Sequence, residues 1–356
     1  MISYLKKIYT YLVQKKKSIL YKFKLKEIIA KNSDFLSEGT FKLFTTNGKV
    51  IIHLENEETA LFIKKHYQNL FKNYRKRIYN LFDPFFKFKV TNSLNKKFSG
   101  QIIIITIEKD IKIFDFKICQ VLTKYQDKEK IFQIKSALAI LDPFFQNTIL
   151  HFSDHYQVEE LIGKEANQKC FSQLTNSEKD NAFRSLMLNY KKYFNQLSSQ
   201  SLQYISLENI CKQLRKEKYE NVCDRIEKII LHSSSFNSIL QPRVFLHGDL
   251  HYGNILIDNE RVKLIDFERS GDYILVYDFF NFICEEIVSQ NNYLFLEAYY
   301  NCKYDDLLFD FFNQLEMTYD VDKKIEYLIF FLAERILKRG FFSRELRFLN
   351  DIEKLL

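Results

Sequence analysis

The sequence predicts an α+β fold in two lobes, a small lobe built on an antiparallel sheet and a larger helical lobe after it. Three observations support this prediction. Short runs rich in β-branched residues, separated by polar turns, occur between residues 84 and 163. Apolar residues then recur at helical intervals over most of the remaining chain. Residues 247–268, in which a polar loop is followed by short apolar runs, interrupt these helices. A chain of 356 residues is long enough for two lobes.

The small lobe is expected to span residues 84–163. Strands are predicted for residues 85–90, 101–108 and 111–119. A helix follows, marked by the apolar residues Ile131, Ile134, Leu138 and Leu141. Two further short strands are predicted within residues 148–163. Residues 1–83 are expected to form a basic, mostly helical extension with a hairpin at Asn47-Gly48, a strong two-residue turn signal.

The larger lobe is expected to span residues 164–356. Helices are predicted for residues 176–197, 205–218 and 219–232, and again from about residue 276 to the end. Between them, "RVFLHGDLHYGNILI" and "RVKLIDFE" each contain a short apolar run suited to a strand. A loop that connects two short strands brings their ends together.

Composition excludes several classes of protein. No pair of the six cysteines has CxxC spacing, which argues against a zinc finger or a redox motif and favours reduced, mostly buried thiols in a cytoplasmic protein. No stretch of about 18 apolar residues predicts a membrane-spanning helix. The first residues lack the pattern of a secretion signal.

The net charge of +8 is unevenly distributed. Residues 1–50 hold 11 Lys and 3 acidic residues, a net charge of +8, whereas residues 285–326 hold 10 acidic residues and 3 Lys, a net charge of −7. The basic stretch suits contact of residues 1–31 with a membrane surface, with a solvated helical face as the alternative. No nucleic-acid partner is expected.

The segment 247–268 carries the residues with the clearest chemistry. The two predicted strands would bring Asp249, Asn254 and Asp266 near one point. Two carboxylates and a carboxamide offer the hard oxygen ligands that suit Mg²⁺ with bound phosphates. A zinc site made of His247, Asp249 and His251 is the alternative, although it lacks an evident fourth ligand.

The same segment resembles a known family. The stretch His247-Gly248-Asp249-Leu250-His251-Tyr252-Gly253-Asn254 resembles the phosphotransferase loop of aminoglycoside phosphotransferases and choline kinases. Leu264-Ile265-Asp266-Phe267-Glu268 and Tyr277-Asp278-Phe279 resemble the continuation of the pattern. The resemblance implies the two-lobed protein-kinase-like fold, with residues 84–163 as the small lobe and hinge, 247–254 as the catalytic loop and 264–268 as the metal-binding segment.

The resemblance also implies roles for these residues. Asp249 would accept or orient the proton of the attacking hydroxyl, and His247 would brace the loop. Asn254 and Asp266 would hold Mg²⁺, and ATP would be the second cofactor. Asp278, Gly248, Gly253 and His251 are expected to support the loop, the two glycines by allowing a tight backbone.

The nucleotide side is expected to include a lysine on the third strand of the small lobe, paired with a glutamate on the next helix. Lys117 and Glu129 fit this pattern, with Lys112 as the alternative lysine.

The resemblance thus implies an ATP- and Mg²⁺-dependent phosphotransferase acting on a hydroxyl of a small molecule, such as a sugar, an amino sugar or an amino alcohol. The alternatives are a non-catalytic binding or scaffold protein on the same fold, whose basic N-terminal region binds a membrane or nucleic acid, and a protein kinase of the same lineage. The acidic stretch would attract a cationic acceptor through residues such as Glu285, Glu286, Asp305, Asp306 and Asp310. A solvated acidic face is the alternative for that stretch.

Overall fold

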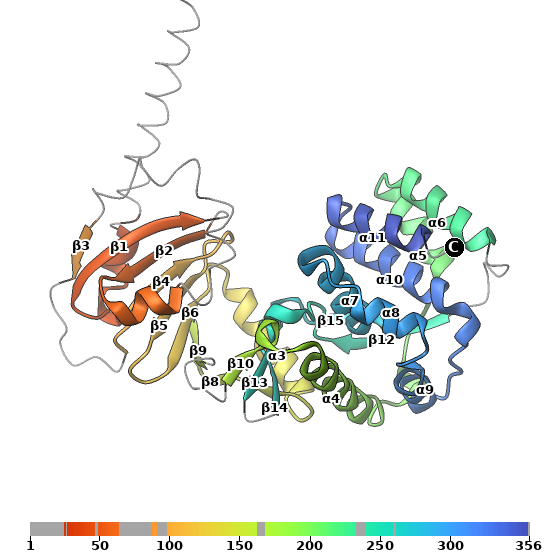
Figure 1. Ribbon diagram of the computed structural model, residues 1–356, viewed down its shortest axis with the longest axis horizontal. Helices are drawn as coiled ribbons and strands as arrows, with labels where there is room; N and C mark the ends of the chain where they lie inside the picture. The colour runs from red at the N-terminus through yellow and green to blue at the C-terminus, as the bar shows by residue number, and fades with distance from the viewer. Residues whose placement is uncertain are drawn as a thin grey trace, which may run out of the picture. The chain divides into compact units, whose positions relative to one another are not determined.

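The computed structural model describes residues 25, 27–46, 49–63, 87–90, 98–161, 168–232, 240–258 and 261–354. The chain forms two compact units, drawn in Figure 1. The first unit comprises residues 1–128 and 149–164, and the second comprises residues 129–148 and 165–356. No helix of the described residues is long and apolar enough to cross a membrane.

The first unit is built on one sheet, in which eight strands of the described residues follow the order β3-β1-β2-β4-β5-β6-β9-β8. Strand pairs are antiparallel throughout, as in the register Ile103 to Ile113 between β4 and β5. The strands are β1 (Gly39–Thr46), β2 (Lys49–Leu54), β3 (Lys87–Val90), β4 (Ile102–Ile105), β5 (Ile111–Asp115), β6 (Gln120–Lys124), β8 (Ile149–Phe152) and β9 (Tyr156–Glu160).

Both faces of this sheet are buried. Ile103 and Ile105 of β4 pack in one core with Ile29, whereas Ile102 and Ile104 pack in a second core with Ile63. Successive side chains of a strand point to opposite faces, so a run of four isoleucines is suited to a strand covered on both sides.

The sheet crosses the predicted domain boundary at residue 83. Strands β1 and β2 lie before that boundary, yet β2 pairs with β4 through residues such as Ile51 and Ile104. The predicted hairpin is confirmed by the pairing of Thr46 with Lys49, and its two turn residues lie outside the described residues. The expected membrane contact of residues 1–31 falls mostly outside the described residues as well.

The predicted strand 111–119 is a shorter strand followed by a turn that leads into the next strand. Strand β5 ends at Asp115, and β6 begins at Gln120. The Asp115 carboxylate ends the strand because it accepts hydrogen bonds from the backbone N–H of Lys117 (2.9 Å) and of Ile118 (3.4 Å), a common role of Asp in turns. Lys117 is therefore an exposed turn residue rather than a mid-strand residue.

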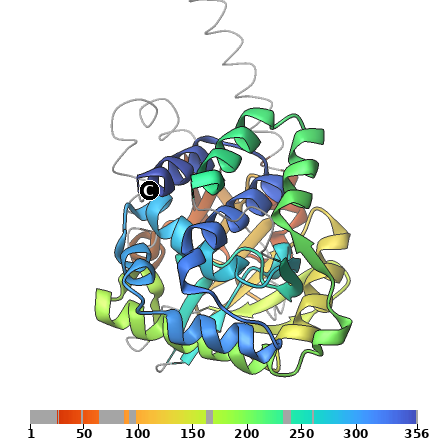
Figure 2. The same cartoon turned by 90° about the vertical axis from the view of Figure 1, so that its right-hand side faces the viewer.

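The second unit contains most of the helices, which surround short strands (Figures 1 and 2). Helix α3 (Lys128–Leu141) was expected in the small lobe but clusters with this unit. The reason is that the residues after it pack here: Phe145 contacts the ring of Tyr190, and β7 (Gln146–Asn147) pairs with β14.

The predicted helices 176–197, 205–218 and 219–232 are confirmed as α4 (Asn176–Phe194), α5 (Leu207–Lys216) and α6 (Glu220–His232). The later helices are α7 (Tyr277–Gln290), α8 (Leu294–Tyr300), α9 (Asp305–Gln314), α10 (Lys324–Arg339) and α11 (Ser343–Glu353). The strands are β10 (Gln168–Cys170), β11 (Tyr204–Ser206), β12 (Leu240–Leu246), β13 (Ile255–Asp258), β14 (Arg261–Leu264) and β15 (Gly271–Ile274).

Candidate active site

The loop 247–254 leaves the end of β12 and enters β13 through a 3₁₀ turn, Tyr252–Asn254. Strand β12 pairs with β15, and β13 pairs with β14. Both ends of the loop are therefore fixed by sheet pairing.

The buried carboxylate of Asp278, in the first turn of α7, holds the start of the loop. It accepts hydrogen bonds from the backbone N–H of His247 (2.9 Å) and Gly248 (3.0 Å) and from the hydroxyl of Tyr190 (2.6 Å). Burial raises the pKa of Asp278, while His247, Tyr190 and the two backbone N–H groups act against this rise. The three donors account for the carboxylate's place in the core, because a buried charge needs hydrogen-bonding partners.

Gly248 is required by its backbone conformation. Its φ of 74° lies in the left-handed region, and a Cβ at this position would lie 2.3 Å from the carbonyl oxygen of Arg269. The loop could not make this turn with a larger residue.

The fully buried ring of His247 links the loop to the segment before Asp266. Its Nε2 lies 2.9 Å from the carbonyl oxygen of Ile265, and its Nδ1 accepts the backbone N–H of Asp249 (3.3 Å). Together these contacts require the tautomer with the proton on Nε2. Because both nitrogens are engaged, the alternative zinc site at His247, Asp249 and His251 does not fit the structure.

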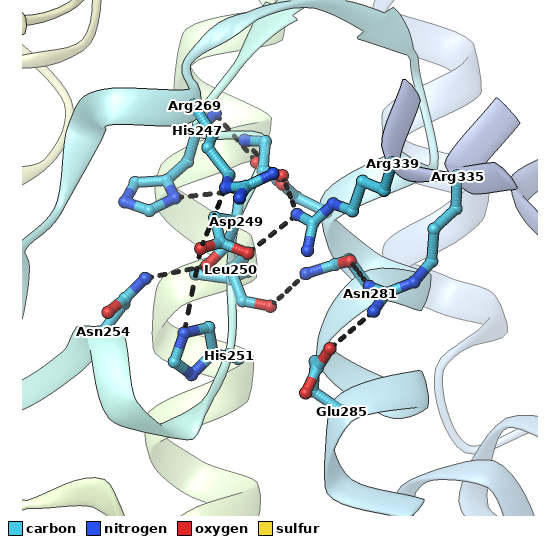
Figure 3. Close-up of polar contacts among 12 residues, drawn as sticks. His247, Asp249, Leu250, His251, Asn254, Arg269, Asn281, Glu285, Arg335 and Arg339 are labelled. Atoms are coloured by element: carbon cyan, nitrogen blue, oxygen red, sulfur yellow. Dashed lines mark hydrogen bonds and ion pairs between the residues drawn. The ribbon is translucent and has the colours of Figure 1, made fainter. Parts of the chain in front are cut away.

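The carboxylate of Asp249 lies near nitrogen atoms of two arginines and a histidine (Figure 3). Its Oδ1 is 2.7 Å from a guanidinium nitrogen of Arg339, and its Oδ2 is 3.9 Å from both Nε of Arg269 and Nε2 of His251. Burial acts to raise the pKa of Asp249, but Arg339 and the histidines outweigh it and hold the pKa below its usual value. Asp249 is therefore ionised near neutral pH.

The two candidate metal ligands lie on neighbouring segments. The side-chain nitrogen of Asn254 donates to the carbonyl oxygen of Asp249 (2.9 Å), which directs the amide oxygen elsewhere. The backbone N–H of Ile265 donates to the carbonyl of Asn254 (3.1 Å) and so ties the Asp266 segment to the loop. An amide oxygen and a carboxylate are suitable ligands for Mg²⁺.

Asp266 has a left-handed backbone, with φ of 67° and ψ of 62°. This conformation is unfavourable for a residue with a Cβ and persists only where the surroundings impose it, often at functional sites.

A buried ionic network supports the middle of the loop. The side chain of Asn281 donates to the carbonyl of Leu250 (2.8 Å) and accepts from Arg335. Arg335 also binds Glu285 (2.6 Å) and Glu345 (3.0 Å). Sequence reasoning missed Arg335 and Arg339, although two arginines four residues apart in an apolar helix lie on one face of that helix.

The predicted nucleotide pair lies on different units of the structure. Lys117 is in the β5–β6 turn of the first unit, and Glu129 is exposed in the first turn of α3 in the second unit. Within the second unit, Lys130 of α3 forms an ion pair with Glu268 (3.0 Å), just after Asp266.

The acidic residues that were expected to attract a cationic acceptor each form an ion pair with a lysine or arginine of the helices. The pairs are Glu285 with Arg335 (2.6 Å), Glu286 with Lys179 (3.7 Å), Asp305 with Lys324 (2.7 Å), Asp306 with Arg184 (3.5 Å) and Asp310 with Lys191 (2.7 Å). These contacts favour the alternative, in which the acidic stretch serves the packing and surface of the helices.

Residues 144–308 match the family model described as Choline/ethanolamine kinase. The chain is similar to choline/ethanolamine kinases over this range, which is less than half of its length. It is a phosphotransferase with an alcohol group as the acceptor. The matched range contains the loop, Asp266 and Asp278, but not Arg335 and Arg339. No curated protein sequence matches this chain.

Solved structures similar to this kinase-like protein share little of its sequence. A choline/ethanolamine kinase family protein from Mesorhizobium loti is 12% identical, with a TM-score of 0.42, over 69% of this chain and 84% of that one. A choline kinase from Streptococcus pneumoniae is 13% identical, with a TM-score of 0.41, over 70% of this chain and 90% of that one. The likeness to this family therefore rests on the matched sequence range.

Replacing Asp278 by Asn should destabilise the protein by about 1–3 kcal/mol, because an amide cannot accept from all three donors and one is left buried without a partner. Chemical denaturation measures this loss. Tyr190→Phe, which removes only one donor, is the matched control and should cost less. Equal stability of Asp278→Asn and wild type would contradict the role of Asp278.

Replacing Arg339 by Ala should shift the acid limb of the pH–rate profile to higher pH. The pKa of Asp249 is lowered partly by Arg339, so removal of this cation lets the carboxylate protonate at a higher pH. Lys338→Ala is the control, because the Lys338 ammonium lies over the ring of Tyr273. An unchanged acid limb in Arg339→Ala would show that Arg339 does not set the protonation of Asp249.

Proposed function

We propose that the protein uses ATP and Mg²⁺ to phosphorylate a hydroxyl group of a small molecule, such as a sugar, an amino sugar or an amino alcohol. The observation that carries this proposal is the carboxylate of Asp249, which is kept ionised beside Arg339 and is linked through its own carbonyl oxygen to Asn254. Phosphoryl transfer depends mainly on positioning and on neutralisation of charge, so a small set of fixed polar groups is sufficient.

The polar residues of the site have separate roles in this proposal. Asp249 orients the acceptor hydroxyl and takes its proton, and Asn254 and Asp266 hold Mg²⁺. When bound, Mg²⁺ would neutralise charge on the phosphates of ATP. His247 keeps the Asp266 segment beside the loop through its bond to Ile265.

The nucleotide lysine is assigned to Lys124 in place of Lys117. The family resemblance pairs a lysine on the third strand of the small lobe with a glutamate on the next helix. The predicted third strand ends at Asp115, and the strand directly before α3 is β6, which ends at Lys124. The Lys124 ammonium donates to the side chain of Asn32 (2.7 Å), and burial lowers its pKa. Lys112 of β5 is the alternative.

A panel of acceptors tests the proposed function. Wild-type protein should consume ATP in the presence of Mg²⁺ with at least one of choline, ethanolamine, glucosamine and neutral sugars, and should release ADP and a phosphorylated acceptor. Asp249→Ala should lower the rate by about 10²- to 10⁴-fold, because the acceptor loses the group that orients it and takes its proton.

Binding of ATP measured by calorimetry is the control for this experiment, and it should be retained in Asp249→Ala. If wild-type protein forms no phosphorylated product with any acceptor of the panel, the proposed substrate class is wrong. If Asp249→Ala turns over as fast as wild type, the role of Asp249 is wrong.

Variants on the nucleotide side should behave differently from Asp249→Ala. Asp266→Ala should weaken binding of Mg²⁺ with ATP by about tenfold or more, because a metal ligand is lost. Lys124→Met should weaken ATP binding, whereas Lys117→Met, a change of the same type in the β5–β6 turn, should leave it unchanged. Titration calorimetry with and without Mg²⁺ measures all three, and equal effects of the two lysine variants would refute the assignment to Lys124.

A further inference from the structure

The two oxygens of the Asp249 carboxylate have different surroundings. Oδ1 is 2.7 Å from Arg339, within hydrogen-bonding distance. Oδ2 is 3.9 Å from Nε2 of His251 and 3.9 Å from Nε of Arg269, and both distances are too long for a hydrogen bond. Among the described residues, no side chain therefore donates a hydrogen bond to Oδ2, although two N–H groups lie just beyond reach of it.

The ring of His251 is held so that one of these N–H groups is fixed. Its Nδ1 accepts the backbone N–H of Gly253 (3.0 Å) at the start of the 3₁₀ turn. A nitrogen that accepts a hydrogen bond carries no proton, so the proton of the neutral ring is on Nε2, which lies on the side of Asp249 (Figure 3). Burial lowers the pKa of His251, while Asp249 acts in the opposite direction.

The separation of 3.9 Å between Nε2 of His251 and Oδ2 of Asp249 allows one oxygen beside the line joining them to contact both atoms. An oxygen at about 2.8 Å from the nitrogen and about 2.7 Å from the carboxylate makes two ordinary hydrogen bonds. With the two protein atoms 3.9 Å apart, the angle at that oxygen is about 90°, close to the directions in which a hydroxyl donates and accepts.

We propose that this position holds the acceptor hydroxyl, and the proposal rests on the function proposed above. His251 Nε2–H donates to the hydroxyl oxygen, and the hydroxyl donates its proton to Oδ2 of Asp249. During transfer the oxygen forms a bond to the terminal phosphorus of ATP, and the bond from that phosphorus to the leaving oxygen of ADP breaks. The hydroxyl proton passes to Oδ2 of Asp249 and is later released to water.

His251 binds the acceptor as a neutral donor and does not act as a base. Its Nδ1 is already engaged by Gly253, so the ring has no free nitrogen to take a proton. Arg269 is a less defined donor, because half of its side chain is exposed (50%) whereas His251 is fixed by the cap. A preorganised donor loses less entropy on binding.

Two variants separate this role from simple capping of the turn. In His251→Asn, the side-chain oxygen can still cap the turn by accepting the Gly253 N–H, because Asn is among the preferred capping residues, but its amide does not reach the place of Nε2. In His251→Gln, the amide nitrogen reaches about the place of Nε2. Thermal unfolding of both variants checks the fold.

The assays use the full-length protein with Mg²⁺ and ATP. The acceptor is choline, ethanolamine, glucosamine or water, and transfer to water is hydrolysis of ATP. His251→Asn should lower kcat/KM for the acceptor by about 10- to 100-fold while the affinity for ATP stays at the wild-type value. His251→Gln should recover part of this loss. In a high-resolution crystal structure of the protein, a water oxygen should lie within about 2.6–3.2 Å of both Nε2 and Oδ2.

Near-wild-type turnover by His251→Asn, with a larger loss in His251→Gln, would overturn the proposal, since it is the result expected of a cap alone. An empty gap in the crystal structure, or Oδ2 bonded directly to a protein group, would also overturn it. Absence of any turnover by wild type overturns instead the proposed function, so the two failures are distinguishable.

Discussion

The candidate site depends on the carboxylate of Asp278. This one buried group accepts from two consecutive backbone N–H groups of the loop and from Tyr190 of α4, so it fixes where the loop starts. Asn281 and Glu285 follow three and seven residues later in α7, which places them on the same helical face as Asp278. Asn281 binds the carbonyl of Leu250, and α7 therefore holds the loop at two points.

The charges behind the loop are arranged so that each arginine of α10 has its own acid. Arg335 is almost fully buried and binds Glu285 and Glu345, whereas Arg339, one turn later, reaches Asp249. A buried cation that lost its partner would be strongly destabilising, so these pairings are tightly constrained. Because Arg335 is paired with these two acids, Arg339 is the arginine of α10 that forms the close ion pair with Asp249.

Local patterns predicted much of this structure. The pairing of β1 with β2, the helices α4 to α6 and the two strands that flank the loop followed from turn residues and periodicity, which act over a few positions. The position of Lys117 was wrong because a single side chain, Asp115, ends the strand, and a turn of this kind has no signal in the apolar pattern. The boundary at residue 83 and the place of α3 depend on pairing between distant segments, which the spacing of residues does not encode. The contact of Arg339 with the loop also joins distant segments of the chain, so the spacing of residues does not encode it.

The pairing of Arg339 with the loop has a consequence for how the protein is made. Arg339 and Gly248 are hydrogen bonded across 91 positions of the chain. At a synthesis rate of about 5–20 residues per second, the loop leaves the ribosome on the order of ten seconds before helix α10 is complete. A nascent chain that already holds residues 247–254 therefore lacks the cation that pairs with Asp249 in the folded protein. The complete charge pattern of the loop is established late in translation, after the helix that carries Arg339 has emerged and folded.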